Sequence, residues 1–199
     1  MKRIIALILL VVVGYACSTE TQSESAVGEQ QLEKVPEVAV VTPYEDGSGV
    51  ARAEVWDGES LRSVGESIDG LRHGAWMEFT PDGKPSALVT YHRGVQQGVV
   101  LDFDKQGYLK NKKFYVQGEF DGPYLVYKRN KLMESRLYSA GELNGTVRKY
   151  YDNGRLKEEA PYDQGNLHGV AKWFDQEGNL KLAYEYDQGE LVDKEAEVD

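Results

Sequence analysis

The chain is poor in the residues that build redox and metal sites. Cys17 is the only cysteine among 199 residues, and there are three histidines. A single cysteine cannot form an intrachain disulfide, and a metal site built from several cysteines is excluded as well. The sequence also lacks a Walker loop, a Gly-x-Ser-x-Gly elbow and a His-Glu-x-x-His pair. It therefore predicts no catalytic residues, no metal ligands and no cofactor.

Long hydrophobic runs are missing too. The longest apolar stretch, Ile4–Val13, has about ten residues, whereas a membrane-spanning helix needs about 20. Two basic residues precede this stretch and small residues follow it. This order is typical of a secretory signal peptide. We therefore predict that residues 1–16 are a signal peptide.

An excess of positive charge is also absent. Acidic residues outnumber basic ones by 33 to 23, which gives a formal net charge of -10. Nucleic-acid binding depends on Lys and Arg side chains that neutralise phosphates. The charge balance therefore argues against a nucleic-acid partner.

The place of Cys17, directly after the apolar run, resembles a bacterial lipobox. The resemblance implies cleavage before Cys17 and acylation of its thiol and of the new amino terminus. Gly14 stands where that motif prefers a leucine-like residue, and Tyr15 is bulkier than the motif usually allows. Two or three acyl chains would anchor a protein stably in a membrane, and Ser18 implies the outer membrane. The expected location is the cell envelope, and the alternative is a plain signal peptide.

Residues 17–46 have the composition of a tether. They are rich in Ser, Thr, Glu and Gln and show no helical or strand period outside a short apolar stretch. Such a segment buries too little apolar surface to offset the loss of chain entropy. We expect a flexible acidic tether with a reach of roughly 30 Å. The alternative is that residues 36–44 dock as an edge strand.

A repeat occupies the rest of the chain. The pattern Gly-x-x-x-Gly begins at Gly70, Gly94, Gly118, Gly141 and Gly165, at intervals of 24, 24, 23 and 24 residues, and a partial unit begins at position 189. An aromatic residue follows each first glycine by nine positions, and a tyrosine precedes each following unit by three. A fixed period over several positions indicates a repeat architecture.

Each unit resolves into two strands. In the last full unit, VAKWF and NLKLAYEY flank the turn DQEG, and apolar residues alternate in the second stretch. We predict an all-β fold, an elongated antiparallel meander of stacked β-hairpins with about ten to twelve strands. Residues 47–193 form this domain, with a degenerate capping unit at 47–69 and a charged tail at 194–199.

The unit GELNGTVRKYYDNGRLKEEAPYDQG, residues 141–165, resembles the bacterial MORN-repeat variant of proteins labelled YwqK-family antitoxins. The resemblance covers about residues 47–192 and implies the fold. It says little about activity, since the family is not known as a set of enzymes and the antitoxin label rests on weak association. Eukaryotic MORN proteins with repeats of canonical length are implicated in lipid contact and protein scaffolding, which is an analogy only.

The function expected from these observations is a non-catalytic, lipid-anchored scaffold that binds a protein partner. One alternative is an antitoxin-like inhibitor of a specific effector. Another is a binder of surface glycan or lipid, which would need a row of exposed aromatic residues without charges on one face.

Two sets of residues are candidates for a site. His73 and His168 precede second glycines, where other units have Gln97, Asp121 and Asn144, so we interpret them as polar corner residues.

The recurring aromatic residues are expected to form the packed face: Phe79, Phe103, Tyr127, Tyr150 and Phe174. The candidate partner-binding surface consists of aromatic residues that do not recur, because Tyr and Trp are enriched at interfaces: Trp76, Tyr124, Tyr151 and Trp173. The alternative is that they only stabilise a single-layer sheet.

Overall fold

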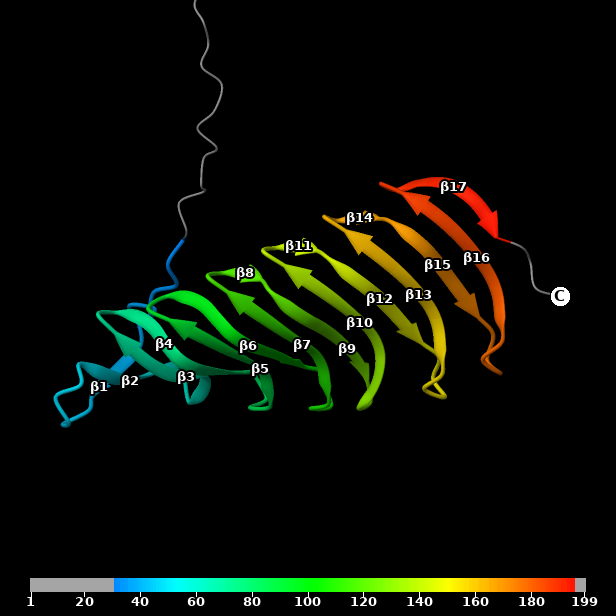
Figure 1. Ribbon diagram of the computed structural model, residues 1–199. Coiled ribbons are helices and arrows are strands. Elements are labelled where there is room, and N and C mark those ends of the chain that lie inside the picture. Colours follow the sequence, from blue (N-terminus) through cyan, green and yellow to red (C-terminus); the bar gives the residue numbers. More distant parts are fainter. Residues whose placement is uncertain (1–30, 196–199) are drawn as a thin grey trace, which may run out of the picture.

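The computed structural model describes residues 31–195. Within this range all strands belong to one antiparallel sheet, and no residue is helical. The strands follow one another in chain order, so the molecule is long in the direction in which they stack (Figure 1). The prediction of an all-β antiparallel meander is therefore confirmed.

The strands are β1 (Val40–Pro43), β2 (Val50–Asp57), β3 (Ser60–Ile68), β4 (Leu71–Phe79), β5 (Pro85–His92), β6 (Val95–Phe103), β7 (Leu109–Val116), β8 (Glu119–Phe120), β9 (Gly122–Lys128), β10 (Lys131–Ser139), β11 (Glu142–Leu143), β12 (Gly145–Tyr150), β13 (Leu156–Asp163), β14 (Asn166–Leu167), β15 (Gly169–Phe174), β16 (Leu180–Asp187) and β17 (Glu190–Glu195).

The described strands number 17 instead of the predicted ten to twelve. The five repeats supply ten long strands, two in each unit, as predicted. The added strands are β1 to β3 before the repeats, β17 after them, and the two-residue strands β8, β11 and β14. Each short strand is separated from the next long strand by one residue whose N–H turns back to the preceding strand, as His168 does to Pro161 O at 3.0 Å. This local bulge interrupts the pairing.

The first glycine of each unit lies in a two-residue hairpin turn. In Gln164–Gly165 both residues have positive φ, 47° and 81°, which is the combination of a type I′ turn. Successive turns are linked, since Gly165 N–H donates to Leu143 O and Gly189 N–H to Leu167 O, each at 2.8 Å. These turns and the short strands β8, β11 and β14 form one row at the ends of the long strands (Figure 1). We call this row of strand ends the corner edge.

The opposite edge, which we call the turn edge, carries longer hairpin turns in four of the five units. In one of them Asp175 Oδ1 accepts the N–H groups of Glu177 and Asn179, at 3.0 and 2.8 Å. The third unit differs, because Arg129 and Asn130 alone join β9 to β10, both with positive φ, 49° and 66°. This shorter turn explains why the third unit has 23 residues.

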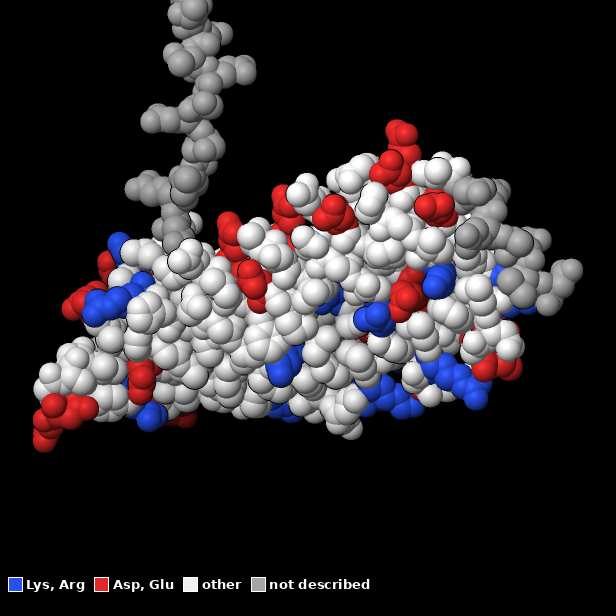
Figure 2. Space-filling model, viewed as in Figure 1, with Lys and Arg blue, Asp and Glu red and all other residues white. Residues whose placement is uncertain are grey.

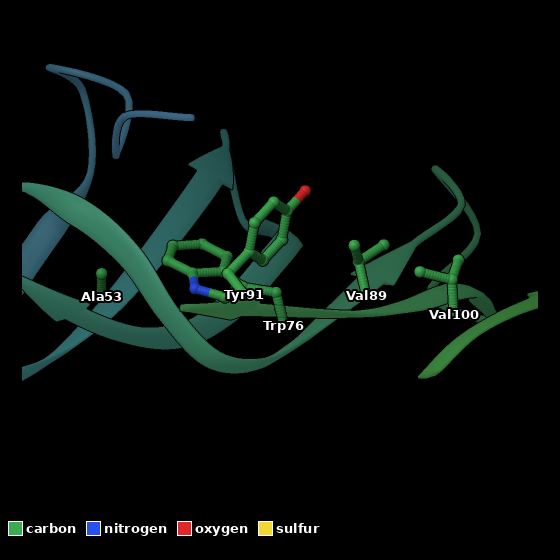
Figure 3. Packing of buried hydrophobic residues seen from close by; sticks show 5 residues of the cluster. All are labelled: Ala53, Trp76, Val89, Tyr91 and Val100. Carbon is green, nitrogen blue, oxygen red and sulfur yellow. The ribbon is translucent and has the colours of Figure 1, made fainter. Parts of the chain in front are cut away.

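A buried core lies in the N-terminal half of the sheet. Trp76 pairs with Val89, and Val89 pairs with Val100, so the three side chains lie on one face; we call it the Trp76 face. The Trp76 ring lies against Gly65, where an added Cβ would be 2.5 Å from the ring. The core cluster consists of Ala53, Trp76, Val89, Tyr91 and Val100 (Figure 3).

Part of the segment expected to be a tether is folded. β1 pairs with β2, so the structure has the edge strand that was the alternative for residues 36–44. Upstream, Val35 packs against the core cluster, and Glu33 hydrogen-bonds to the corner edge. The expectation of an unstructured chain up to residue 46 was wrong from Leu32 onward, because these residues find apolar and backbone partners on the sheet. The predicted signal peptide, Cys17 and residues 196–199 lie outside the described residues.

Candidate functional site

The four candidate aromatic residues do not form one surface. Trp76 is 0% exposed, so its assignment to a partner surface was wrong. Gly65 lies against the indole ring and leaves room for it because it has no side chain. The indole N–H donates to Glu66 O at 2.8 Å. Tyr124, Tyr151 and Trp173 are half-buried and belong to three different units.

Tyr124 lies in the middle of the Trp76 face between two cations. Lys113 Nζ is 5.9 Å and Arg136 Cζ is 5.4 Å from the centroid of its ring. Phe120 and Tyr138 also contact the ring, with centroids 5.8 and 6.3 Å away. A cation over an aromatic ring is attracted by the negative face of the ring. This part of the face therefore lacks the uncharged aromatic row that a glycan or lipid binder would need.

The cations beside Tyr124 are paired with carboxylates on the same face. Lys113 Nζ is 2.6 Å from Asp102 Oδ2, and Arg136 Nε is 2.7 Å from Glu134 Oε1. Burial disfavours the charged form of Lys113, but the hydrogen bond and charge of Asp102 outweigh it, so the pKa of this ammonium is raised. The hydrogen bond to Glu134 likewise raises the pKa of Arg136. Both cations stay charged at neutral pH.

Trp173 and the recurring aromatic residues are part of the sheet packing. The Trp173 ring lies 5.6 Å from that of Tyr184, centroid to centroid. The recurring residues pair with the start of the following strand, as Phe103 does with Leu109 and Phe174 with Leu180. All five recurring aromatic residues are half-buried. Each comes three residues after a residue of the Trp76 face, as Phe79 does after Trp76 and Phe103 after Val100, so alternation places it on the opposite face, near the turn edge. They therefore do not belong to the face that carries the buried core, which differs from the expectation for them.

The histidines before second glycines contact residues that stand just before the next corner. His73 Nδ1 accepts the N–H of Arg93 at 3.4 Å, as Gln97 Oε1 accepts that of Gln117 at 2.9 Å. His168 Nδ1 lies 3.1 Å from Asp187 Oδ1. These contacts support the interpretation as polar corner residues. In the part of the chain that the structure describes, no group of three or more His, Cys, Asp or Glu residues is arranged to hold a metal ion.

Two hollows flank the turn at residues 151–155, next to the shortened turn of the third unit. They have volumes of about 370 and 410 Å³ and share Tyr150, Asp152 and Asn153. Lys131 and Leu132 line the first hollow, while the second lies beside Tyr151 and Lys157. In the sequence, these hollows are indicated by the third glycine that the third unit lacks. Its shorter turn leaves the neighbouring turn at residues 151–155 uncovered.

Tyr151 stands at a position where other units have a residue that caps its own turn. Asp104 and Asp175 accept backbone N–H groups there, whereas the Tyr151 hydroxyl donates to Phe174 O in the next unit, at 2.7 Å. Lys157 Nζ lies 5.9 Å from the centroid of the Tyr151 ring. Tyr151 is therefore bound within the sheet, and its half-buried ring borders the second hollow.

The face opposite Trp76 carries an apolar patch that the sequence analysis missed. Met77 pairs with Leu88, Leu88 with Leu101, and Lys112 with both Leu101 and Leu125. No second layer of described residues covers this face, and Leu137 at its border is 45% exposed. The apolar patch consists of Met77, Leu88, Val99, Leu101, Phe114, Leu125 and Leu137.

The apolar patch ends where the repeat changes. The third residue after the second glycine is Met77, Leu101 and Leu125 in the first three units, but Arg148 and Lys172 in the last two. The change from apolar to charged residues at this repeat position can be read from the sequence. Its meaning becomes visible only when the position is assigned to a face of the sheet.

Two comparisons bear on the repeat. A scan against protein-family models finds one family twice, at residues 143–164 and 167–188, with starting points one repeat period apart. These segments match the MORN repeat variant. A comparison with curated proteins gives no match. The MORN repeat variant thus covers the C-terminal units, and the observed hairpins extend the same architecture to the units before them. Among residues 31–195 no helix has the length and apolar content needed to cross a membrane.

Proposed function

We propose that this protein is a non-catalytic scaffold, anchored by lipid at Cys17 in the cell envelope, that holds a protein partner against its sheet. The MORN repeat variant found at residues 143–164 and 167–188 supports a binding or membrane-associated module. The outer membrane is the proposed location, as Ser18 implies.

The observation that carries the proposal is the apolar patch on an uncovered sheet face. The patch residues are half-buried apart from Leu137, which is 45% exposed, and Lys112 lies among them. Apolar surface that no second layer covers marks sites of association. Charged groups replace it in the last two units at Arg148 and Lys172, so the apolar surface is confined to one part of the sheet. A protein partner with a complementary apolar surface fits this arrangement better than a glycan, which would need uncharged aromatic platforms.

The scaffold is tested by photo-crosslinking in intact cells. A crosslinking amino acid placed at Leu125 or Leu137 should capture a defined envelope protein that mass spectrometry can identify. The same amino acid at Lys172, which occupies the repeat position of Leu125, is the matched control and should capture much less of it. Equal capture from both positions, or none from either, would contradict the proposal.

The anchor is tested separately by Cys17→Ala. We expect the processed variant to leave the membrane fraction, because acylation at this position would be lost. Continued membrane fractionation of a fully processed variant would show that the anchor is not at Cys17. A one-to-one complex that abolishes the toxicity of the captured protein would instead favour the antitoxin-like inhibitor.

A further inference from the structure

The corner edge already binds an extended segment of this chain. Glu33 N–H donates to Gly94 O at 2.8 Å, and Val35 N–H donates to Gly70 O at 2.9 Å. Glu33 O in turn accepts the N–H of Arg72 at 3.0 Å, and Lys34 forms an antiparallel bridge with Leu71. Two successive corners thus act together as an edge to which a strand is added.

The added segment advances by two residues for each unit that it crosses. Val35 lies at the first corner and Glu33 at the second. Successive N–H groups on one side of an extended chain are also two residues apart. An extended segment can therefore meet one corner after another with the same set of backbone donors.

The corners further along repeat this geometry. Gly118, Gly141 and Gly165 have φ values of 85°, 82° and 81°, against 83° at Gly94. Each follows a residue of positive φ and donates its own N–H to the unit before it, as Gly94 does to Arg72 O. The carbonyl groups that accept Glu33 and Val35 thus have counterparts at each of these turns.

These later corners are uncovered by the described segment. Gly94 is buried because Leu32 and Glu33 lie over it, whereas Gly118, Gly141 and Gly165 are exposed. Among the described residues, no backbone N–H outside the strands donates to the carbonyl groups of these three glycines.

The charge of the uncovered corners indicates what could bind there. The turns at 116–121, 139–144, 163–168 and 187–191 contain acidic residues and no Lys or Arg. Figure 2 shows acidic side chains along this edge, while the opposite edge carries lysine and arginine side chains together with acidic ones. The Glu119 carboxylate reaches over the following corner, with Oε2 3.7 Å from the position of a Cβ on Gly141. The acidic residues of these corners are Glu119, Asp121, Glu142, Asp163, Asp187 and Glu190.

We propose that the uncovered part of the corner edge, from Gly118 to Gly189, binds an extended basic segment of a partner protein by strand addition. Backbone N–H groups of the segment bind the corner carbonyl groups, as those of Glu33 and Val35 do, and its Lys or Arg side chains meet the acidic corners. Main-chain bonds give affinity in this mode of recognition, and side chains give selectivity. The inference rests on the proposed scaffold function and adds the chemistry of its partner.

The test uses the purified full chain in mild detergent and a synthetic ten-residue peptide that alternates lysine with threonine. Fluorescence anisotropy should show saturable binding that weakens with salt, because exposed charges are screened. The same peptide with glutamate in place of lysine should not bind. A fully N-methylated lysine peptide keeps the charge but lacks the donors, and it should bind at least about tenfold more weakly.

The protein variant for this test is Glu119→Gln/Glu142→Gln, which removes two charges from the corner edge. We expect it to weaken binding of the lysine peptide by about fivefold or more. The matched control, Asp57→Asn/Glu59→Gln, removes two exposed charges from the turn edge and should change binding less than about twofold. Equal losses in both variants, or equal binding of the N-methylated peptide, would overturn strand addition at the corner edge.

The outcome separates this inference from the scaffold function. A partner captured at Leu125 together with no peptide binding at the corner edge would overturn only the inference. Peptide binding at the corner edge without any captured partner in cells would support the inference and count against the scaffold function.

Discussion

In the N-terminal half of the sheet, Trp76 and Val100 occupy the second position after the second glycine, and they pack with Val89 into a buried core. In the C-terminal half the same position holds Val147 and Ala171. These residues are also buried, but neither is as large as Trp76, and half-buried ion pairs such as Lys149–Glu158 stand beside them. One repeat frame is thus filled by a bulky apolar core at one end and by small residues and charge pairs at the other.

The two halves also differ at their surfaces. In the N-terminal half, residues 32–35 cover the corner edge, and an apolar patch lies on the face opposite Trp76. In the C-terminal half the corner edge is uncovered and acidic, and Arg148 and Lys172 interrupt the apolar surface. The glycines and recurring tyrosines build the frame, and the variable positions make the halves different. Changes at variable positions should therefore affect one half more than the other.

The largest effect is expected for Trp76→Ala. Loss of a fully buried indole should lower the free energy of unfolding by about 3–5 kcal/mol, and hydrogen exchange should rise first in β2 to β6. Val147→Ala, at the same repeat position, should cost only about 1–2 kcal/mol. Urea denaturation followed by circular dichroism measures both values. Similar losses for the two variants would show that the halves do not differ in core packing.

A second comparison uses two corner glycines with nearly equal φ, Gly94→Ala and Gly165→Ala. Both variants place an alanine in the left-handed region, which costs about 1–2 kcal/mol. Only at Gly94 would the new Cβ also meet the added segment, 3.1 Å from Glu33 O; at Gly165 nothing lies within 4 Å.

Gly94→Ala should therefore release the segment at residues 31–39 and speed its cleavage by proteases, since exposed and unpaired backbone is cut more readily. Limited proteolysis with mass spectrometry locates the cut. Equal cleavage of both variants within this segment would contradict the role of the Gly94 corner in holding it.

The frame of the repeat was predictable because it depends on local chemistry. Positive φ at the corner glycines and alternation in the strands are properties of neighbouring residues, and they gave the two long strands of each unit. Burial of Trp76 could not be predicted in this way. It depends on Gly65, which lies outside the five repeats and comes opposite Trp76 only through the pairing of β3 with β4.

The contacts of residues 32–35 were missed for a related reason, whereas the strand within residues 36–44 was only an alternative. The composition of this segment is typical of a flexible chain, but Val35 and Glu33 gain apolar contacts and backbone bonds from turns that are distant in the sequence. For the candidate site, the sequence pointed to differences between units. The shortened turn at Arg129–Asn130 and the change from Leu125 to Arg148 are such differences. Their meaning depended on knowing which edge and which face they occupy.

A smaller effect is expected at the boundary between the halves, for Asp102→Asn. In the unaltered protein the bond and charge of Asp102 outweigh the effect of burial on Lys113. Burial remains in the variant, so the pKa of Lys113 should fall from its raised value to below the ordinary value of about 10.4. NMR titration of the Lys113 side chain measures the change.

The sign of the pH dependence follows from the raised pKa. The charged form of Lys113 stabilises the fold below the unfolded-state pKa of about 10.4, and this contribution is lost as the pH rises through the folded-state pKa. Asp102→Asn should therefore have a lower free energy of unfolding than the unaltered protein at neutral pH. The difference between the two should become smaller at alkaline pH. An unchanged Lys113 pKa in the variant would show that Asp102 does not hold this ammonium.

The smallest effect is expected for Tyr151→Phe, within the C-terminal half. It removes the hydroxyl that donates to Phe174 O at 2.7 Å, and a single hydrogen bond of this kind contributes about 0.5–1.5 kcal/mol. Tyr108→Phe, at an exposed tyrosine of the second unit, should change stability by less than about 0.5 kcal/mol. Thermal unfolding of both variants gives the comparison. A loss at Tyr151 no greater than that at Tyr108 would mean that this bond does not couple the fourth unit to the fifth.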